Sequence, residues 1–296
     1  MADITASMVK ELRECTGAGM MECKKALSES GGDLDSAVDI LRTRGLAALA
    51  KKAGRATNEG TIAAFVSPDS KVGVLVEVNS ETDFVGRNAE FTSFAAELAE
   101  HIAAEAPDDV SSMMAQTISA KGITVEQLFG EKVSKLGENM GIARFAREEI
   151  QGTGAVATYI HGGGKIGILV AFAFNNEATA ANAAFQTYAR DIAMQVAAAS
   201  PLFVKRDDAP ADVIEHEMSI YKAQAAESGK PEQIQEKMAQ GRLEKYFKEV
   251  ALIEQPFVKN PDMTVTQYTA ETDKAVGDTI SVVGFTRFIL GASAAE

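Results

Sequence analysis

The sequence is poor in the residues that build metal centres. Its 296 residues include only two cysteines and three histidines. Seven residues separate Cys15 from Cys23, and the histidines lie far away along the chain, whereas a zinc site needs four ligands at close, paired spacing. We therefore expect no metal site, no cofactor and two free thiols, as in a protein of a reducing compartment.

Long apolar segments are also missing. No stretch approaches the roughly 18 consecutive apolar residues that a membrane-spanning helix requires. The N-terminal sequence MADITASMVKELRE carries acidic residues early and has no apolar segment of the kind found in signal peptides. We expect a cytoplasmic protein that does not contact membranes.

Positive charge is scarce as well, with a net charge of −13. Because binding to phosphate groups needs a basic surface, this charge argues against a direct nucleic-acid partner. Residues 1–56 differ from the rest: nine Lys and Arg against eight Asp and Glu give +1, which leaves −14 for the remainder. The basic run Lys51–Arg55 could face an acidic partner, although a solvated helix end is the commoner explanation for such a run.

The length of the chain indicates about two domains. Residues 4–46 predict three short helices, with apolar residues at helical spacing and glycines between the segments. Thr5 can cap the first helix and Asp33 the third, and Gly45 is expected to end the third. We expect a small three-helix bundle, followed by a connection over residues 46–60.

An internal repeat begins at residue 60. A shift of 94 residues aligns GTIAAFVSPDSKVGVLVEV (60–78) with GAVATYIHGGGKIGILVAF (154–172), and fourteen of the 48 positions over residues 60–107 are identical. Each copy predicts a β-hairpin followed by an alanine-rich helix that starts near Asn88 or Asn182. The expected fold class is therefore α+β, with a duplicated β-β-α core.

Further elements follow each copy of the repeat. Residues 142–150 and 281–290 resemble strands that would extend the two sheets. Residues 208–250 predict two helices joined at a Gly-Pro tip, with apolar residues in a heptad seam. They form either a protruding antiparallel coiled-coil arm or helices that pack on their own domain. The expected domains are residues 1–56, 57–140 and 141–296, with the arm inside the last.

Catalytic patterns are hard to find. No histidine lies near a nucleophile in a recognisable sequence pattern, which leaves open an enzyme whose site is assembled only in space. The segment His161–Lys165 superficially resembles a phosphate-binding loop. The lysine is followed by Ile166 rather than Ser or Thr, and the required glycine spacing is absent. The repeat indicates a hairpin turn there instead.

The two copies differ sharply just after their second strand. Copy one has NSETDFVG at residues 79–86, whereas copy two has AFNNEATA at residues 173–180. A difference within a shared scaffold indicates a role specific to the segment Thr82-Asp83-Phe84-Val85. Either Phe84 is exposed to bind a partner, or it folds onto its own core while Asp83 caps the next helix. The residues alone leave both interpretations open.

Several long segments resemble one known family. These are VKELRECTGAGMMECKKAL (9–27), GGDLDSAVDILRTRG (31–45), LVEVNSETDFVGRNAEF (75–91), HGGGKIGILVA (161–171) and GFTRF (284–288). Over nearly the whole chain they resemble the elongation factor Ts family. The resemblance implies a ubiquitin-associated-like (UBA-like) N-terminal bundle, and a core of two subdomains formed by the repeats. It further implies one partner, the GTPase elongation factor Tu, whose GDP release the protein accelerates without covalent chemistry, and it leaves open a 2:2 assembly.

The same resemblance implies roles for particular residues. Within the segment Thr82–Val85, Asp83 and Phe84 would insert between helices of the GTPase near its magnesium site. Further partner contacts are implied for Arg13, Met20, Met21, Leu136, Gly137 and His161. The other hypothesis is a scaffold whose N-terminal bundle binds peptides or ubiquitin-like proteins. The Thr82–Val85 segment speaks against it, because such a scaffold has no need for that loop.

Overall fold

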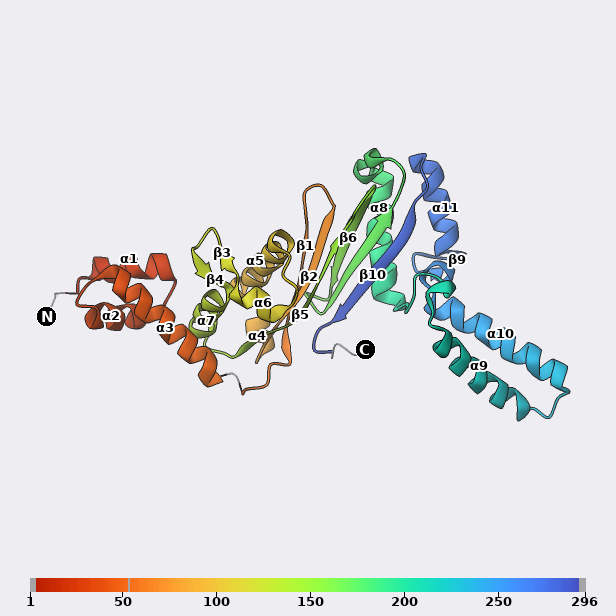
Figure 1. Ribbon diagram of the computed structural model, residues 1–296, viewed down its shortest axis with the longest axis horizontal. Helices are drawn as coiled ribbons and strands as arrows, with labels where there is room; N and C mark the ends of the chain where they lie inside the picture. Colours follow the sequence, from red (N-terminus) through yellow and green to blue (C-terminus); the bar gives the residue numbers. More distant parts are fainter. Residues whose placement is uncertain (1–3, 53, 293–296) are drawn as a thin grey trace.

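The computed structural model describes residues 4–52 and 54–292. Residues 1–3, at the start of the sequence considered as a signal peptide, and Ala53, within the basic run Lys51–Arg55, lie outside the described residues. The fold mixes helices and antiparallel sheets, which confirms the α+β class. Figure 1 shows an elongated molecule with a helical bundle at the N-terminal end, two sheets in the middle and a pair of helices at the other end.

The N-terminal bundle has three helices: α1 (Ala6–Thr16), α2 (Met20–Glu29) and α3 (Leu34–Lys52). Two predicted caps are confirmed. The Thr5 hydroxyl accepts a 3.3 Å hydrogen bond from the backbone of α1, and the Asp33 carboxylate accepts a 2.7 Å bond from the backbone of α3. The bundle buries a small core made of Val9, Leu12, Cys23, Ala26, Leu27, Ala37 and Leu41.

Helix α3 does not end at Gly45, as the sequence predicts, but continues to Lys52. The reason is a close crossing with α7 (Val125–Leu136). A Cβ atom on Gly45 would lie only 3.1 Å from the backbone of Gly130, and one on Gly130 only 3.0 Å from the backbone of Gly45. Glycine at Gly45 therefore serves helix contact rather than helix termination.

A pair of alanine substitutions tests this interpretation. Gly241 lies inside α10 (Glu232–Val250), where an added Cβ would meet no other described atom within 4 Å. Gly241→Ala should raise the free energy of unfolding by about 0.5–1 kcal/mol, because alanine favours helix. Gly45→Ala should instead lower it by about 1–3 kcal/mol, because the methyl group overpacks the crossing. Chemical denaturation measures both, and stabilisation by both substitutions would contradict the proposed crossing contact.

The first repeat forms a three-stranded antiparallel sheet in the order β1-β2-β5. The strands are β1 (Glu59–Val66), β2 (Val72–Ser80) and β5 (Met140–Glu149). Helix α5 (Ala89–Glu105) packs on one face of the sheet, where its apolar residues meet Val74, Val76 and Val78. The boundary expected between residues 140 and 141 falls just after the first residue of β5, which pairs with β2 as far as Glu149.

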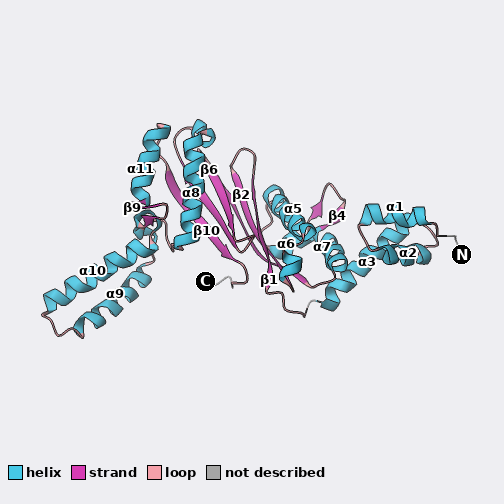
Figure 2. Ribbon diagram, turned by 180° about the vertical axis from the view of Figure 1, so that it is seen from behind, coloured by secondary structure: helices cyan, strands magenta, loops and turns pink. Residues whose placement is uncertain are grey.

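The second repeat forms the corresponding sheet in the order β10-β7-β6. The strands are β6 (Gly154–His161), β7 (Ile166–Ala173) and β10 (Ser281–Ile289). Helix α8 (Ala183–Ala199) covers this sheet, as Figure 2 shows from behind. Shorter elements complete both halves: α6 (Val110–Ala115), β3 (Thr117–Ile118), β4 (Ile123–Thr124), β8 (Pro256–Phe257), β9 (Asn260–Thr264), α11 (Val265–Val276) and the 3₁₀ turns η1 (Glu177–Ala181), η2 (Arg206–Asp208) and η3 (Leu252–Glu254).

The two sheets pack against each other through a second apolar layer. Ile62 and Leu75 of the first sheet meet Val156 and Leu169 of the second, and Phe288 joins them. These four aliphatic residues occupy equivalent positions in the 94-residue repeat. Each strand that reaches this layer thus has apolar residues on both of its faces. One face packs against the helix of its own repeat, and the other face packs against the other sheet.

Backbone hydrogen bonds across this contact follow the same symmetry. The N–H of Ile62 donates to the carbonyl of Gly164 at 2.8 Å, and the N–H of Val156 donates to the carbonyl of Ser70 at 2.8 Å. Both donors and both acceptors are related by 94 positions. The two halves therefore meet through an interface in which each contributes the same surface.

The structural repeat is longer than the one detected in the sequence. In both halves a short hairpin leads into a helix that begins with a Thr-Gln capping box and ends at a left-handed glycine, α7 in one half and α11 in the other. The segments TVEQ (124–127) and TVTQ (264–267) match at a shift of 140 residues, 46 more than in the hairpin part. The added length corresponds to an inserted pair of helices.

These inserted helices, α9 (Ala211–Ala226) and α10, pack on each other and extend away from the sheets (Figures 1 and 2). Their ends are tied together at the base. The N–H of Leu202 donates to the carbonyl of Val250 at 2.8 Å, and the N–H of Leu252 donates to the carbonyl of Phe203 at 2.9 Å. None of the helices described in residues 4–52 and 54–292 is both long and apolar enough to cross a membrane.

Candidate partner-binding surface

The segment that distinguishes the two repeats is a single helical turn, α4 (Asp83–Gly86). The sequence predicts a strand-to-helix loop here, and one of the two interpretations left open has Asp83 as a cap of the following helix. Instead Thr82 caps α4, since its hydroxyl accepts a 3.4 Å bond from the N–H of Val85. The following helix α5 is capped by Asn88, whose side chain accepts a 2.8 Å bond from the backbone.

Phe84 projects from this turn into solvent, with 84% of its surface exposed. The alternative in which Phe84 folds onto its own core is therefore wrong. Its neighbour Val85 packs against the core of the first repeat, and Gly86 is buried against the backbone of Gly60. One side of the turn is thus fixed to the sheet, while the other side presents an aromatic ring. An exposed phenylalanine on a fixed support is typical of a binding surface.

Asp83 lies beside Phe84 and is only loosely paired. Its carboxylate is 3.1 Å from the Arg87 guanidinium, one turn further along; the Arg87 side chain is exposed and that of Asp83 is partly exposed. Such exposed pairs between neighbouring helical turns contribute only about 0.3–0.5 kcal/mol. The Asp83 carboxylate can therefore exchange this pairing for an external one at little cost.

The carboxylates of Glu138 and Glu81 connect the turn with the segment that follows α7. Glu138 accepts a 3.0 Å bond from the N–H of Thr82 and a 2.7 Å bond from its hydroxyl. Glu81 accepts a 2.5 Å bond from the N–H of Asn139 and a 3.2 Å bond from Arg55. The N–H of Asn139, ahead of Arg55, holds the pKa of Glu81 below its usual range. Neither Glu81 nor Glu138 is among the predicted site residues, although Glu138 directly follows one of them, Gly137.

Leu136 and Gly137 come next to the turn because they precede Glu138. Leu136 ends α7 and packs against the core of the first repeat. Gly137 adopts a left-handed conformation with a φ of 80°, which reverses the chain so that the next residue can reach Thr82. Two of the predicted contact residues therefore lie beside Thr82–Val85.

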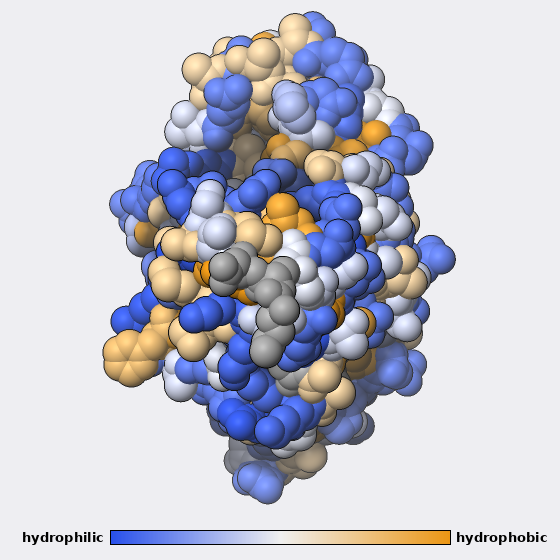
Figure 3. Space-filling view, turned by 90° about the vertical axis from the view of Figure 1, so that its left-hand side faces the viewer, coloured by the Kyte–Doolittle hydropathy of each residue, from blue (hydrophilic) through white to orange (hydrophobic). Residues whose placement is uncertain are grey.

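The predicted residues of the N-terminal bundle are exposed. Arg13 lies in the last turn of α1, and Met20 and Met21 begin α2 with 60% and 64% of their surface exposed. A Cβ atom on Gly17, in the loop before α2, would lie 3.1 Å from Nζ of Lys135. This end of the molecule is mostly hydrophilic, with small separate apolar areas (Figure 3). The short distance between Gly17 and Lys135 shows that the α1–α2 loop lies against the C-terminal end of α7.

His161 belongs to the other half of the molecule. It ends β6, is exposed, and its Nδ1 lies 3.0 Å from the Tyr159 hydroxyl. The glycines that follow all have positive φ values, and the carbonyl of Gly164 receives a backbone bond from Ile62. This geometry confirms the predicted hairpin turn in place of a phosphate-binding loop. The structure does not bring His161 into contact with α4.

The predicted thiols are free, with Cys15 exposed and Cys23 buried, and burial raises the pKa of Cys23. Within residues 4–52 and 54–292, no three His, Cys, Asp or Glu side chains gather in a way that could hold a metal ion. The arrangement described above therefore offers an exposed aromatic residue, a weakly paired carboxylate and exposed methionines. Groups of this kind are typical of surfaces that bind another protein.

Comparisons with known proteins agree with this description. A protein family described as "Elongation factor TS" matches residues 81–292. Elongation factor Ts of Clostridioides difficile (strain 630) is 49% identical over 291 residues, which cover 98% of this chain and 94% of that protein. Elongation factor Ts of Trichlorobacter lovleyi is 46% identical over 97% of this chain and 93% of its own length. Elongation factor Ts of Nitratidesulfovibrio vulgaris (strain DP4) is 46% identical over 99% of this chain and 97% of its own. The chain belongs to the elongation factor Ts family.

Proposed function

We propose that this protein is the guanine nucleotide exchange factor of elongation factor Tu in translation elongation. It binds the GDP-bound GTPase, disturbs its magnesium and phosphate site, and promotes the release of GDP. Membership of the elongation factor Ts family supports this function. The observation that carries the mechanism is Phe84, which stands exposed on a helical turn whose other side is fixed to the sheet.

The physics of exchange follows from how GTPases hold GDP. Backbone N–H groups at a helix N-terminus bind the phosphates, and a magnesium ion in strict octahedral geometry bridges them to the protein. Phe84 acts as an apolar anchor between helices of the partner, and Asp83 as the polar group that displaces residues supporting the magnesium ion. Small shifts in these supporting residues weaken GDP binding, because magnesium tolerates little distortion.

Linkage makes the effect reciprocal. If the exchange factor lowers the affinity for GDP by some factor, GDP lowers the affinity for the exchange factor by the same factor. The protein must therefore bind the nucleotide-free GTPase best, since equal affinity for both states would shift nothing. It acts by binding alone and needs no cofactor. Additional partner contacts come from Arg13, Met20, Met21, Leu136, Gly137 and His161.

The proposed organisation assigns a role to each part of the chain. Residues 1–56 form a UBA-like bundle with its linker, which contacts the nucleotide-binding domain of the partner. Residues 57–140 and 141–296 are the two core subdomains, and the helices within residues 208–250 are a coiled-coil arm. The protein works in the cytoplasm, in a 2:2 assembly with its partner. The packing of α9 on α10 and their extension away from the sheets support the arm.

A stopped-flow experiment with fluorescent GDP on elongation factor Tu tests the function. Substoichiometric amounts of this protein should accelerate GDP release, because one molecule acts on many GTPases in turn. A scaffold that binds peptides or ubiquitin-like proteins would leave the release rate unchanged. The proposal would be refuted if the rate of GDP release stayed unchanged at every ratio of the two proteins.

A further inference from the structure

We propose that Glu138 is a positioning residue of the exchange site, which holds the Thr82–Val85 turn in the orientation that exposes Phe84. This inference rests on the proposed exchange function and concerns a residue that contacts the turn, not the partner. Its carboxylate receives both the N–H and the hydroxyl of Thr82, at 3.0 and 2.7 Å. Bonds of this kind to an ionised group are among the strongest that a side chain makes.

The turn needs such support because it is too short to be stable by itself. Helix α4 has only four residues, far fewer than an isolated helix requires. Val85 anchors it on one side through apolar packing. The start of the turn depends on bonds to Thr82. Its carbonyl accepts a 2.8 Å bond from the buried Ser80 hydroxyl, and its N–H and hydroxyl both donate to Glu138. Glu138 fixes the start, since it binds the residue that caps the turn.

The position of Glu138 also connects the turn to the rest of the proposed contact surface. Glu138 follows Gly137, the residue that ends α7, and α7 packs against the N-terminal bundle through the crossing at Gly45 and Gly130. Lys52, at the end of α3, donates a 3.3 Å bond to the carbonyl of Val133 in α7. The bundle with its exposed methionines and the turn with Phe84 are therefore both held by α7 and the residues that directly follow it.

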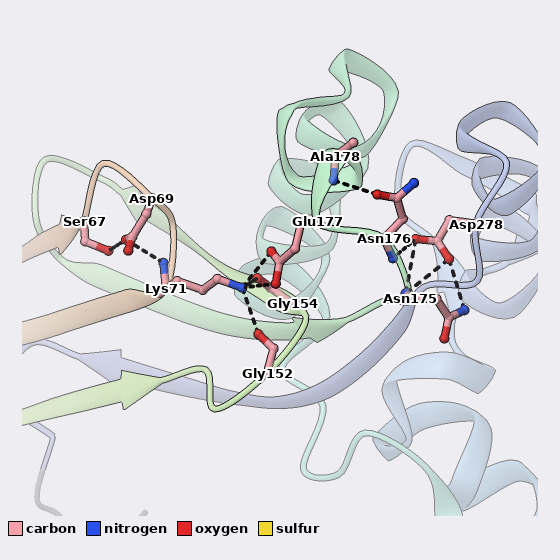
Figure 4. Close-up of polar contacts among 10 residues, drawn as sticks. All are labelled: Ser67, Asp69, Lys71, Gly152, Gly154, Asn175, Asn176, Glu177, Ala178 and Asp278. Atoms are coloured by element: carbon pink, nitrogen blue, oxygen red, sulfur yellow. Dashed lines mark hydrogen bonds and ion pairs between the residues drawn. The ribbon is translucent and has the colours of Figure 1, made fainter.

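The second repeat contains a built-in comparison. Asp278 follows the left-handed Gly277 at the end of α11, as Glu138 follows Gly137. Its carboxylate accepts bonds from the N–H of Asn176 at 3.0 Å and the hydroxyl of Thr179 at 2.7 Å (Figure 4 shows this loop). The Thr179 hydroxyl, ahead of the backbone donors, holds the pKa of Asp278 far below its usual range.

The comparison separates scaffold from function. A carboxylate after a helix-ending glycine holds the strand-to-helix connection in both repeats, so this device belongs to the shared fold. Only the first copy holds an exposed aromatic residue in this connection. In the second copy Phe174, which directly follows β7, is buried, and Ala178 stands at the position equivalent to Phe84. Removal of the two carboxylates should therefore have similar local effects and different functional effects.

The test compares Glu138→Ala and Glu138→Gln with the wild-type protein in the stopped-flow GDP assay. The release rate at saturating exchange factor should fall about tenfold for Glu138→Ala and less for Glu138→Gln, which keeps one acceptor oxygen. Loss of folded protein would only raise the concentration needed for half-saturation and would leave the saturating rate unchanged. Amide hydrogen exchange over residues 82–87 should become faster in both variants.

Asp278→Ala and Phe84→Ala are the controls. Asp278→Ala should speed amide exchange over residues 175–179 and leave the saturating rate at the wild-type value. Phe84→Ala tests the exchange function itself. If Phe84→Ala slows release but both Glu138 variants retain the wild-type rate, the positioning role is overturned and the exchange function stands. If Phe84→Ala has no effect, the proposed function of the turn fails first.

Discussion

Replacing Asp83 and Phe84 together by alanine should slow the release of GDP from elongation factor Tu by about 100-fold or more, the size of loss typical for a central anchor of a protein interface. Phe84 has most of its surface in solvent and makes no contribution to the cores of this protein that would confuse the result. Asp83 has only an exposed pairing with Arg87. The measurement is the saturating rate of fluorescent GDP release.

A matched control removes another exposed apolar side chain. Leu202 is 60% exposed and lies at the base of the helix pair, far along the chain from the turn. Leu202→Ala should leave the release rate unchanged. Both variants should keep the wild-type melting temperature, because none of the three side chains is part of a buried cluster. A double variant at residues 83 and 84 with wild-type release would exclude the turn from the mechanism.

The largest expected effect on stability comes from Glu77, on β2 between the two sheets. Only 1% of its surface is exposed. Its carboxylate pairs with Arg144 at 2.9 Å and accepts bonds from the Asn79 side chain at 3.1 Å and the N–H of Gly291 at 2.9 Å. Glu77→Ala should lower the free energy of unfolding by about 3–5 kcal/mol, because it leaves a half-buried guanidinium without its partner.

Two further variants identify the cause of this loss. Glu77→Leu combined with Arg144→Leu should recover much of the stability, since no uncompensated charge remains. Glu177→Ala removes an ion pair with Lys71 that is far more exposed, and should cost at most about 1 kcal/mol. Guanidinium denaturation gives all three values. A loss for Glu77→Ala no larger than that for Glu177→Ala would contradict the role assigned to the buried pair.

Local chemistry made much of the fold predictable. The caps at Thr5, Asp33, Asn88 and Asn182 involve a side chain and a backbone group two or three residues away, so short sequence patterns report them. The hairpins were predictable because both copies place turn-forming residues at the same point between two apolar runs, Pro68 and Asp69 in one copy and Gly162–Gly164 in the other. The segment containing Phe84 was recognisable because the two copies differ sharply there, at equivalent positions of a shared scaffold.

Distant contacts explain the errors. Gly45 looks like a helix end in its own neighbourhood, and its role depends on Gly130, a residue 85 positions away. The second part of the repeat escaped detection because the inserted helices change the shift from 94 to 140 residues. The match of TVEQ with TVTQ at residues 124 and 264 was the signal that could have found it. Exposure of Phe84 was undecidable from sequence, since it depends on which side of a four-residue helix faces the sheet.

The closed base of the inserted helices has a consequence for how this protein can vary. Because Leu202 and Val250 are bonded to each other, the chain leaves the core and returns to it at nearly the same point. The structure of the core therefore does not depend on the length of the chain between these two residues. Even doubling the length of a flexible connection costs only about 0.6 kcal/mol in closure entropy. The outer part of the helix pair can be shortened, lengthened or replaced while the surface around Phe84 keeps its shape, so the reach of the molecule and its exchange chemistry can evolve separately.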